Sequence, residues 1–215
     1  GANAGHTIVL GKEQYALHLV PSGILYPDKI TVLGSGMVID PEALFAELAM
    51  LESRGVDWKG RVLISDRAHI VLPRYREMDK QQEAARRKPI GTTGRGIGVA
   101  YSVKASRDGI RLADLEDPER LATLEDEDRA FLARYAERLL PMSVDLVAFL
   151  RQHRNSWTLF EGAQGALLDI DTGTYPYVSS GMSNASGAAA QGGIGPRAID
   201  KVLGVFKAYT TRVGN

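Results

Sequence analysis

Short apolar runs that alternate with helix-forming segments most constrain what this chain can fold into. Strand-like runs, β-branched or apolar and several of them bounded by Gly or Pro, occur at Thr7–Leu10, Tyr15–Val20, Ile30–Leu33, Arg61–Ile64, Trp157–Phe160 and Phe206–Val213. Strands alternating with helices predict an α/β fold with a mainly parallel sheet flanked by helices. We expect residues 1–215 to form a single domain portion, because no internal repeat or Ser/Pro-rich linker divides them.

The first predicted helix has clear start and stop signals. Asp40 precedes Pro41, apolar residues recur as far as Leu51, and Gly55 follows. An aspartate N-cap, a proline at the first helical position and a glycine after the last turn are typical of a helix with these bounds.

Two charged regions further along the chain also predict helices. The run from Arg74 to Lys88 is typical of a solvated helix. Residues 117–154 carry Leu and Phe at helical spacing and predict two or three helices, the last of them starting at Pro141.

Composition excludes several classes of function. Lys plus Arg and Asp plus Glu number 26 each, so the chain lacks the basic field that nonspecific nucleic-acid binding needs. It has no cysteine, which rules out disulfides and thiolate metal sites. No apolar stretch approaches the roughly 20 residues that span a membrane, and we expect a cytoplasmic protein. Both ends of the chain have the character of cut loops.

Four glycine-bearing loops carry the candidate chemistry. The first, Asn3-Ala4-Gly5-His6-Thr7, places an amide, an imidazole and a hydroxyl just before a strand. A histidine there can protonate or stabilise a phosphoryl oxygen. The alternative is a plain turn in which Asn3 caps backbone and His6 is merely exposed.

The second loop, Ile90 to Gly98, contains four glycines, two threonines and Arg95. Such a loop predicts a nest of backbone N–H groups that binds phosphate, although neither the Walker A nor the dinucleotide spacing is present. A structural turn is the alternative. Arg107 lies just beyond, and its guanidinium suits phosphate as well as a solvated surface.

The third loop, Phe160 to Gly165, follows a predicted strand, so the Gln164 amide is placed to read a base, with turn formation as the alternative. Asp169 and Asp171 alternate like a metal pair, but backbone and turn roles are the better interpretation. The fourth loop, Thr174 to Pro196, has small hydroxyl residues for phosphate and glycines that equally suit a helix packed on the sheet.

In order along the chain, these runs resemble the adenylosuccinate synthetase family. The matching runs are residues 3–7, 17–25 (Leu-His-Leu-Val-Pro-Ser-Gly-Ile-Leu), 90–98, 160–165, 167–171, 173–178 and 207–214. The resemblance implies an enzyme of P-loop-NTPase-like architecture and a homodimer. It also implies a reaction in which GTP, with Mg²⁺, phosphorylates the 6-oxygen of inosine monophosphate before L-aspartate displaces the phosphate.

The resemblance also assigns site residues. His6 would be catalytic, and the Gly5 carbonyl would hold Mg²⁺. Gly5, His6 and Thr7 would lie near GTP, and Arg107 would reach the partner's site. The inosine monophosphate site would be formed by Asn3, Ala4, Gly5, His6, Thr93, Arg107, Gln164 and Ser179.

Several departures from the family pattern leave alternatives open. Ser179 replaces a threonine, residues 180–184 differ from the usual run, and Val99 replaces a proline. The family's N-terminal lysine-bearing phosphate loop and its C-terminal region are not in this sequence, so we expect these residues alone not to catalyse ligation. The alternatives are an inactive purine-nucleotide-binding or dimerising fragment and a viral-type synthetase that acts on deoxyguanylate.

Overall fold

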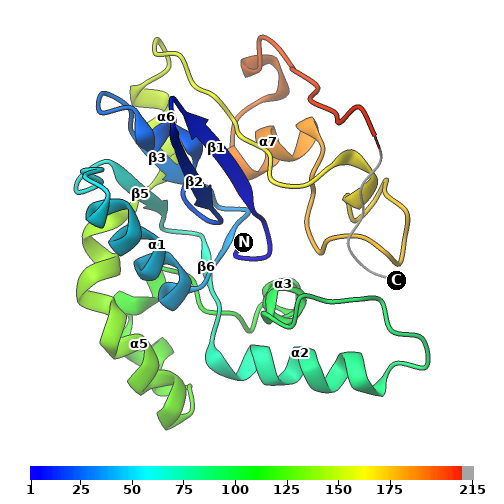
Figure 1. The fold of residues 1–215 in the computed structure, drawn as a ribbon. Helices are drawn as coiled ribbons and strands as arrows, with labels where there is room; N and C mark the ends of the chain where they lie inside the picture. The colour runs from blue at the N-terminus through cyan, green and yellow to red at the C-terminus, as the bar shows by residue number, and fades with distance from the viewer. Residues whose placement is uncertain (210–215) are drawn as a thin grey trace.

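Small parallel sheets form the centre of the molecule, as predicted. The computed structural model describes residues 1–209. β5 (Val62–Ser65) lies between β3 (Thr31–Leu33) and β7 (Ser143–Val144), and all three strands are parallel. β4 (Val38–Ile39) pairs in parallel with β6 (His69–Ile70). Helices surround these strands (Figure 1).

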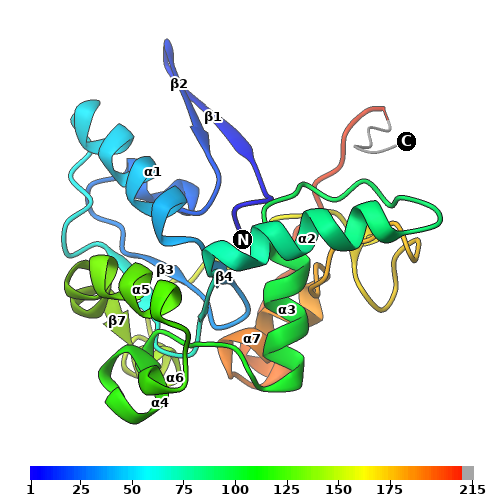
Figure 2. The same ribbon diagram turned by 90° about the horizontal axis from the view of Figure 1, so that it is seen from below.

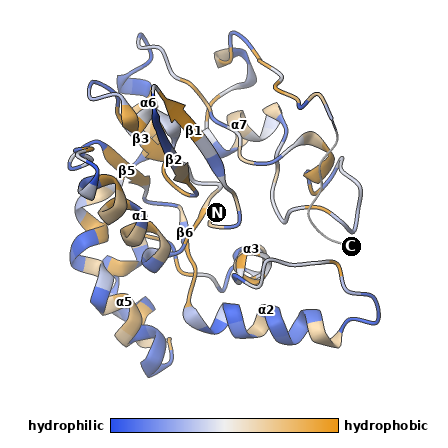
Figure 3. Ribbon diagram, in the orientation of Figure 1, coloured by the Kyte–Doolittle hydropathy of each residue, from blue (hydrophilic) through white to orange (hydrophobic). Residues whose placement is uncertain are grey.

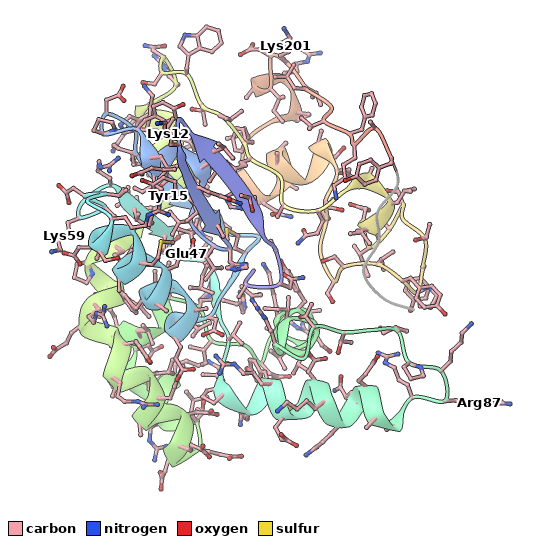
Figure 4. The ribbon with its side chains drawn as sticks, viewed as in Figure 1. Lys12, Tyr15, Glu47, Lys59, Arg87 and Lys201 are labelled. Atoms are coloured by element: carbon pink, nitrogen blue, oxygen red, sulfur yellow. The ribbon has the colours of Figure 1, made fainter. Side chains whose placement is uncertain are left out.

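An antiparallel hairpin stands apart from the parallel strands. It consists of β1 (His6–Leu10) and β2 (Glu13–Leu17), joined at Gly11, whose φ of 62° suits a tight turn. Figure 2 shows it projecting from the body of the molecule, and Lys12 marks its tip in Figure 4. β2 ends three residues before the predicted bound at Val20, because the next N–H groups bind a side chain rather than a strand.

Helix α1 (Pro41–Ser53) forms as its sequence signals predict. The Asp40 carboxylate accepts the N–H of Ala43 at 3.2 Å, and Gly55 follows the helix with a φ of 79°. Buried leucines of α1 face the core, and its Phe45 stacks on Tyr135 of α5 (Asp126–Leu139) with ring centroids 5.8 Å apart.

The region 117–154 contains α4 (Pro118–Ala122), α5 (Asp126–Leu139) and α6 (Leu146–Gln152), as expected. The predicted start of the last helix at Pro141 is wrong. Pro141 lies in a 3₁₀ turn, Leu140–Met142, and α6 begins after Asp145, whose carboxylate accepts the N–H groups of Val147 and Ala148.

The charged helix is confirmed as α2 (Pro73–Ala85), which is mainly hydrophilic in Figure 3. It is not solvated on every side, because Tyr75 and Asp79 are only 2% and 5% exposed. Two helices were not assigned bounds from sequence, α3 (Ile97–Ser106), which packs on α2, and α7 (Ala185–Gly192).

Two predicted strands are not observed. Trp157–Phe160 has no strand structure, and the Trp157 side chain is fully exposed. Of Phe206–Val213, residues 206–209 form no strand, and the rest lies outside the described residues. Within residues 1–209 no helix is both long and apolar enough to cross a membrane.

Candidate functional site

His6 begins β1 and faces a carboxylate from a distant loop. Its Nε2 lies 3.4 Å from Oε1 of Glu161, and the two side chains are 32% and 30% exposed. Nε2 itself is buried and makes no hydrogen bond with any described residue. The other Glu161 oxygen accepts from the backbone N–H and the hydroxyl of Ser22. Three segments remote in sequence therefore meet at one imidazole.

A second histidine fixes the loop that carries His6. His18 Nδ1 lies 2.7 Å from the carbonyl oxygen of Ala4, and its ring lies so close to Gly5 that a Cβ there would be 3.3 Å from Nδ1. The backbone at His18 is held in turn by Glu47, on the buried side of α1, which accepts the N–H groups of His18, Leu19 and Val20. Figure 4 shows Glu47 beside the base of the hairpin.

The glycine-rich loop is joined to the first loop. Arg95 Nη1 donates to the carbonyl of Ala2. Gly91, Gly94 and Gly96 adopt φ values of 76°, 64° and 73°, which side-chain-bearing residues rarely adopt. The backbone conformation of this loop therefore favours glycine at these three positions of the sequence pattern.

The predicted nest at residues 90–98 is in part filled by the protein itself, which corrects the sequence interpretation. Glu83 Oε1 accepts the N–H groups of Ile90 and Gly91 at 2.9 and 2.7 Å and that of Thr92 at 3.4 Å. The N–H of Gly96 donates to Asp79 at 3.0 Å. Residues 93–95 in the middle of the loop, and Ile97 and Gly98 at the start of α3, have N–H groups with no partner among the described residues.

Asp169 joins the turn that follows the third loop to the fourth loop, and the Ser183 hydroxyl of the fourth loop donates to the Gly165 carbonyl of the third. The buried Asp169 carboxylate accepts the N–H groups of Asp171, Thr172, Ser183 and Asn184 at 2.7 to 3.2 Å. These bonds, chiefly those from Ser183 and Thr172, lower the pKa of Asp169 to about 2. The expected backbone role is confirmed, and residues 1–209 contain no group of three side chains suited to a metal ion.

Ser179 and Gln164 lie on these two loops. Ser179 donates its N–H to Leu168, and its neighbour Ser180 lies against the start of α3, where a Cβ on Gly98 would be 3.4 Å from the Ser180 hydroxyl. Gln164 is half-buried, three residues after Glu161. Contacts within the structure thus link all four glycine-bearing loops directly or through α3.

Arg107 lies away from this cluster. It ends α3 in the left-handed conformation, with φ 71°, and is exposed. Ten helical residues separate it from Gly96, a distance of about 15 Å along the axis. Its guanidinium makes no ion pair or side-chain hydrogen bond within residues 1–209. Within one subunit, the length of α3 therefore separates Arg107 from the glycine-rich loop.

Sequence reasoning missed the supporting carboxylates. The sequence leaves Glu161 open between a ligand-contacting and a turn role, and it does not single out Glu47 or Glu83. Glu47 gave a usable signal, because it falls among Leu44, Leu48 and Leu51 on the apolar side of α1, where an acidic residue needs partners. No local pattern marks Glu83, whose partners follow the helix.

The fold and the site define a class, an α/β protein in which glycine-bearing loops suited to anions surround a histidine. The family model of adenylosuccinate synthetase matches residues 1–129 and 124–215. The chain belongs to the adenylosuccinate synthetase family, and the resemblance seen in its motifs is confirmed.

Relatives and solved structures agree with this assignment. The chain is 48% identical to the adenylosuccinate synthetase of Clostridium novyi over 239 residues, covering 100% of this chain and 56% of that protein. The Moorella thermoacetica enzyme is likewise 48% identical, with the same coverage. The fully ligated adenylosuccinate synthetase of Plasmodium falciparum superposes with a TM-score of 0.89 at 40% identity, covering 100% of this chain and 55% of that chain. The chain therefore spans about half the length of its relatives.

A viral structure shares the fold alone. The succinoaminodeoxyadenylate synthetase of cyanophage S-2L, bound to dGMP and dATP, superposes with a TM-score of 0.66 at 23% identity, over 92% of this chain and 51% of that one.

The two stretches matched by the family model overlap at residues 124–129, where α5 begins, and the Clostridium novyi alignment is longer than the 215 residues of this chain. Together these indicate that relatives carry residues near α5 with no counterpart here.

Proposed function

We propose that the full-length protein is a GTP-dependent ligase that joins L-aspartate to inosine monophosphate, giving adenylosuccinate, GDP and phosphate in AMP biosynthesis. The observation that carries the proposal is the convergence around His6 of the 3–7, 17–25 and 160–165 runs, three of the runs that resemble the family. Family membership and the likeness to a fully ligated synthetase support it.

The chemistry explains why a phosphoryl group is transferred first. Oxygen at carbon 6 of the purine is a poor leaving group, whereas a phosphate in its place can be displaced by the aspartate amino group. His6 presents a buried Nε2 with no hydrogen-bond partner, which is what a group awaiting a phosphoryl oxygen requires. Glu161, held by Ser22, stays within reach to orient the imidazole and to balance its charge when it is protonated.

The remaining assignments follow the family motifs. Asn3, Ala4, Gly5, Thr93, Gln164 and Ser179 would complete the inosine monophosphate site, and Gly5, His6 and Thr7 would adjoin GTP. Mg²⁺ commonly keeps several waters and binds substrate phosphates, so one protein ligand at the Gly5 carbonyl is compatible with its chemistry. When bound, the ion would neutralise phosphate charge. In a cytoplasmic homodimer, Arg107 would approach the partner's phosphate.

A direct assay tests the proposal. The full-length protein is supplied with GTP, Mg²⁺, L-aspartate and either inosine monophosphate or deoxyguanylate, and both condensation products are quantified. We expect adenylosuccinate from inosine monophosphate. Binding of inosine monophosphate without turnover would support the inactive binding fragment instead, and preferential use of deoxyguanylate would support the viral-type activity.

A further inference from the structure

Two carboxylates on one face of α2 hold the two ends of the glycine-rich loop. Asp79 and Glu83 are four residues apart, so their side chains lie one above the other on the helix. Glu83 binds the N–H groups of residues 90–92, and Asp79 binds the N–H of Gly96. Neither the charged sequence of α2 nor the family motifs assign these residues a role.

Both carboxylates are engaged by the protein as fixed structural groups. While Glu83 Oε1 binds backbone, its Oε2 lies 3.3 Å from Nε of Arg86, and the side chain is 20% exposed. Asp79 is 5% exposed. Gly96 lies directly on α2, since a Cβ there would come within 2.7 Å of the Tyr75 carbonyl carbon. Close packing and paired charges indicate a fixed attachment rather than a temporary occupant of the nest.

Between its two attached ends, a short stretch of the loop has backbone N–H groups without hydrogen-bond partners. Within the described part of the chain, the N–H groups of Thr93, Gly94 and Arg95 make no hydrogen bond, and Thr93 is exposed. Free backbone donors beside a hydroxyl suit a phosphate. If both ends of the loop were unattached, the entropy of ordering these three residues would oppose phosphate binding.

We propose that Asp79 and Glu83 are positioning residues that clamp the glycine-rich loop, so that residues 93–95 present their N–H groups to the phosphate of inosine monophosphate. The proposal rests on the proposed function for the identity of the nucleotide. Neither carboxylate contacts the nucleotide. Their effect is exerted through the backbone of the loop.

The test compares Glu83→Ala and Glu83→Gln with Glu77→Ala in the full-length protein. Glu77 lies on the same helix, is exposed, and its carboxylate accepts from the side chain of Gln81. Calorimetry gives the dissociation constants for inosine monophosphate and for inorganic phosphate, and thermal unfolding gives Tm. Amide hydrogen exchange at Gly91 and Thr92 is measured in the absence of ligand.

We expect Glu83→Ala to weaken inosine monophosphate binding about tenfold, because three hydrogen bonds to a charged acceptor are lost. Glu83→Gln keeps an acceptor oxygen and should give an intermediate constant, with Glu77→Ala unchanged. Amide exchange at Gly91 and Thr92 should accelerate in Glu83→Ala while its Tm stays close to that of Glu77→Ala, which a general loss of stability would not produce.

Two results would overturn the clamp. An unchanged dissociation constant in Glu83→Ala would show that the loop needs no attachment, and a tighter one would show that the carboxylate competes with phosphate. The proposed function fails separately if the wild-type protein binds inorganic phosphate but not inosine monophosphate. In that case the clamp is tested by comparing the dissociation constants for inorganic phosphate of the wild type and the variants. A wild-type protein that binds neither contradicts both proposals.

Discussion

The imidazole of His6 has a buried Nε2 without a hydrogen bond, 3.4 Å from a carboxylate oxygen. Burying a polar nitrogen without a hydrogen bond costs free energy, which a purely structural turn residue has no reason to retain. We therefore expect His6→Ala to lower kcat of the full-length enzyme by about 10²-fold or more, the scale for a positioned acid–base or electrostatic group. Steady-state kinetics measure this, with His153→Ala as the control because His153 bonds its own helix at Phe149. A change in kcat of only two- or threefold would make His6 a structural residue.

His69 is a second residue whose environment makes a measurable prediction. Burial, then the positive charges of Lys104 and Arg111, lower its pKa from 6.5 to about 4. The unfolded chain takes up a proton near pH 6.5, whereas the folded protein does so only near pH 4. Stability is thus complete above pH 6.5 and falls as the pH is lowered toward 4, by less than about 1.4 kcal/mol per pH unit, the limit for one proton.

Urea unfolding between pH 7.5 and pH 5 should reveal this slope in the wild type and a smaller one in His69→Gln. Equal slopes in the wild type and His69→Gln would mean that His69 titrates alike in the folded and unfolded states.

At the scale of elements, Asp169 decides whether the 160–172 and 179–184 segments stay together. Its four backbone hydrogen bonds join the Asp-Ile-Asp turn to Ser183 and Asn184, and they are strongest when the carboxylate is ionised. We expect Asp169→Asn to lower Tm and to weaken inosine monophosphate binding, since Ser179 lies on the second segment. The exposed Asp171 provides the matched control, because Asp171→Asn makes the same chemical change.

Because the pKa of Asp169 is lowered to about 2, its stabilising effect should be present above its ordinary value of 3.8 and be lost as the pH falls from there toward 2. The Tm difference between wild type and Asp169→Asn should narrow over that range. A constant difference down to pH 2 would contradict the assignment.

An element could be predicted when the residues that cause it to form lie within it or next to it in the sequence. α1 was predicted because its cap, proline and glycine are local, and β3 and β5 because their apolar runs are bounded by breakers. β4, β6 and β7 have two residues each, too few to show a period, and exist only because a parallel neighbour pairs with them. Pro141 failed as a helix start because the capping group, Asp145, lies four residues later.

At the scale of the whole molecule, the motifs identified which loops matter but not how they are held. His6 and Gln164 could be selected from runs that resemble a family. Glu47 instead binds N–H groups 27 to 29 residues away, and Glu83 binds a loop seven to nine residues further on in a geometry that no sequence pattern marks. The structure also separates Arg107 from the glycine-rich loop by the length of α3. Either Arg107 has no role in the site, or it serves another copy of the chain.

Subunit mixing distinguishes these cases. Arg107→Gly removes the guanidinium and suits the left-handed backbone at this position, so it should raise the nucleotide KM without lowering Tm. If Arg107 completes the partner's site, mixing equal amounts of Arg107→Gly and His6→Ala protein and allowing subunits to exchange should restore about a quarter of wild-type activity. Half of the dimers are then mixed, and each mixed dimer contains one site with both residues intact. If Arg107 acted within its own subunit, no mixed dimer would contain an intact site. The activity of the mixture would then remain the average of the two variants measured separately, and the placement of Arg107 in the partner's site would be wrong.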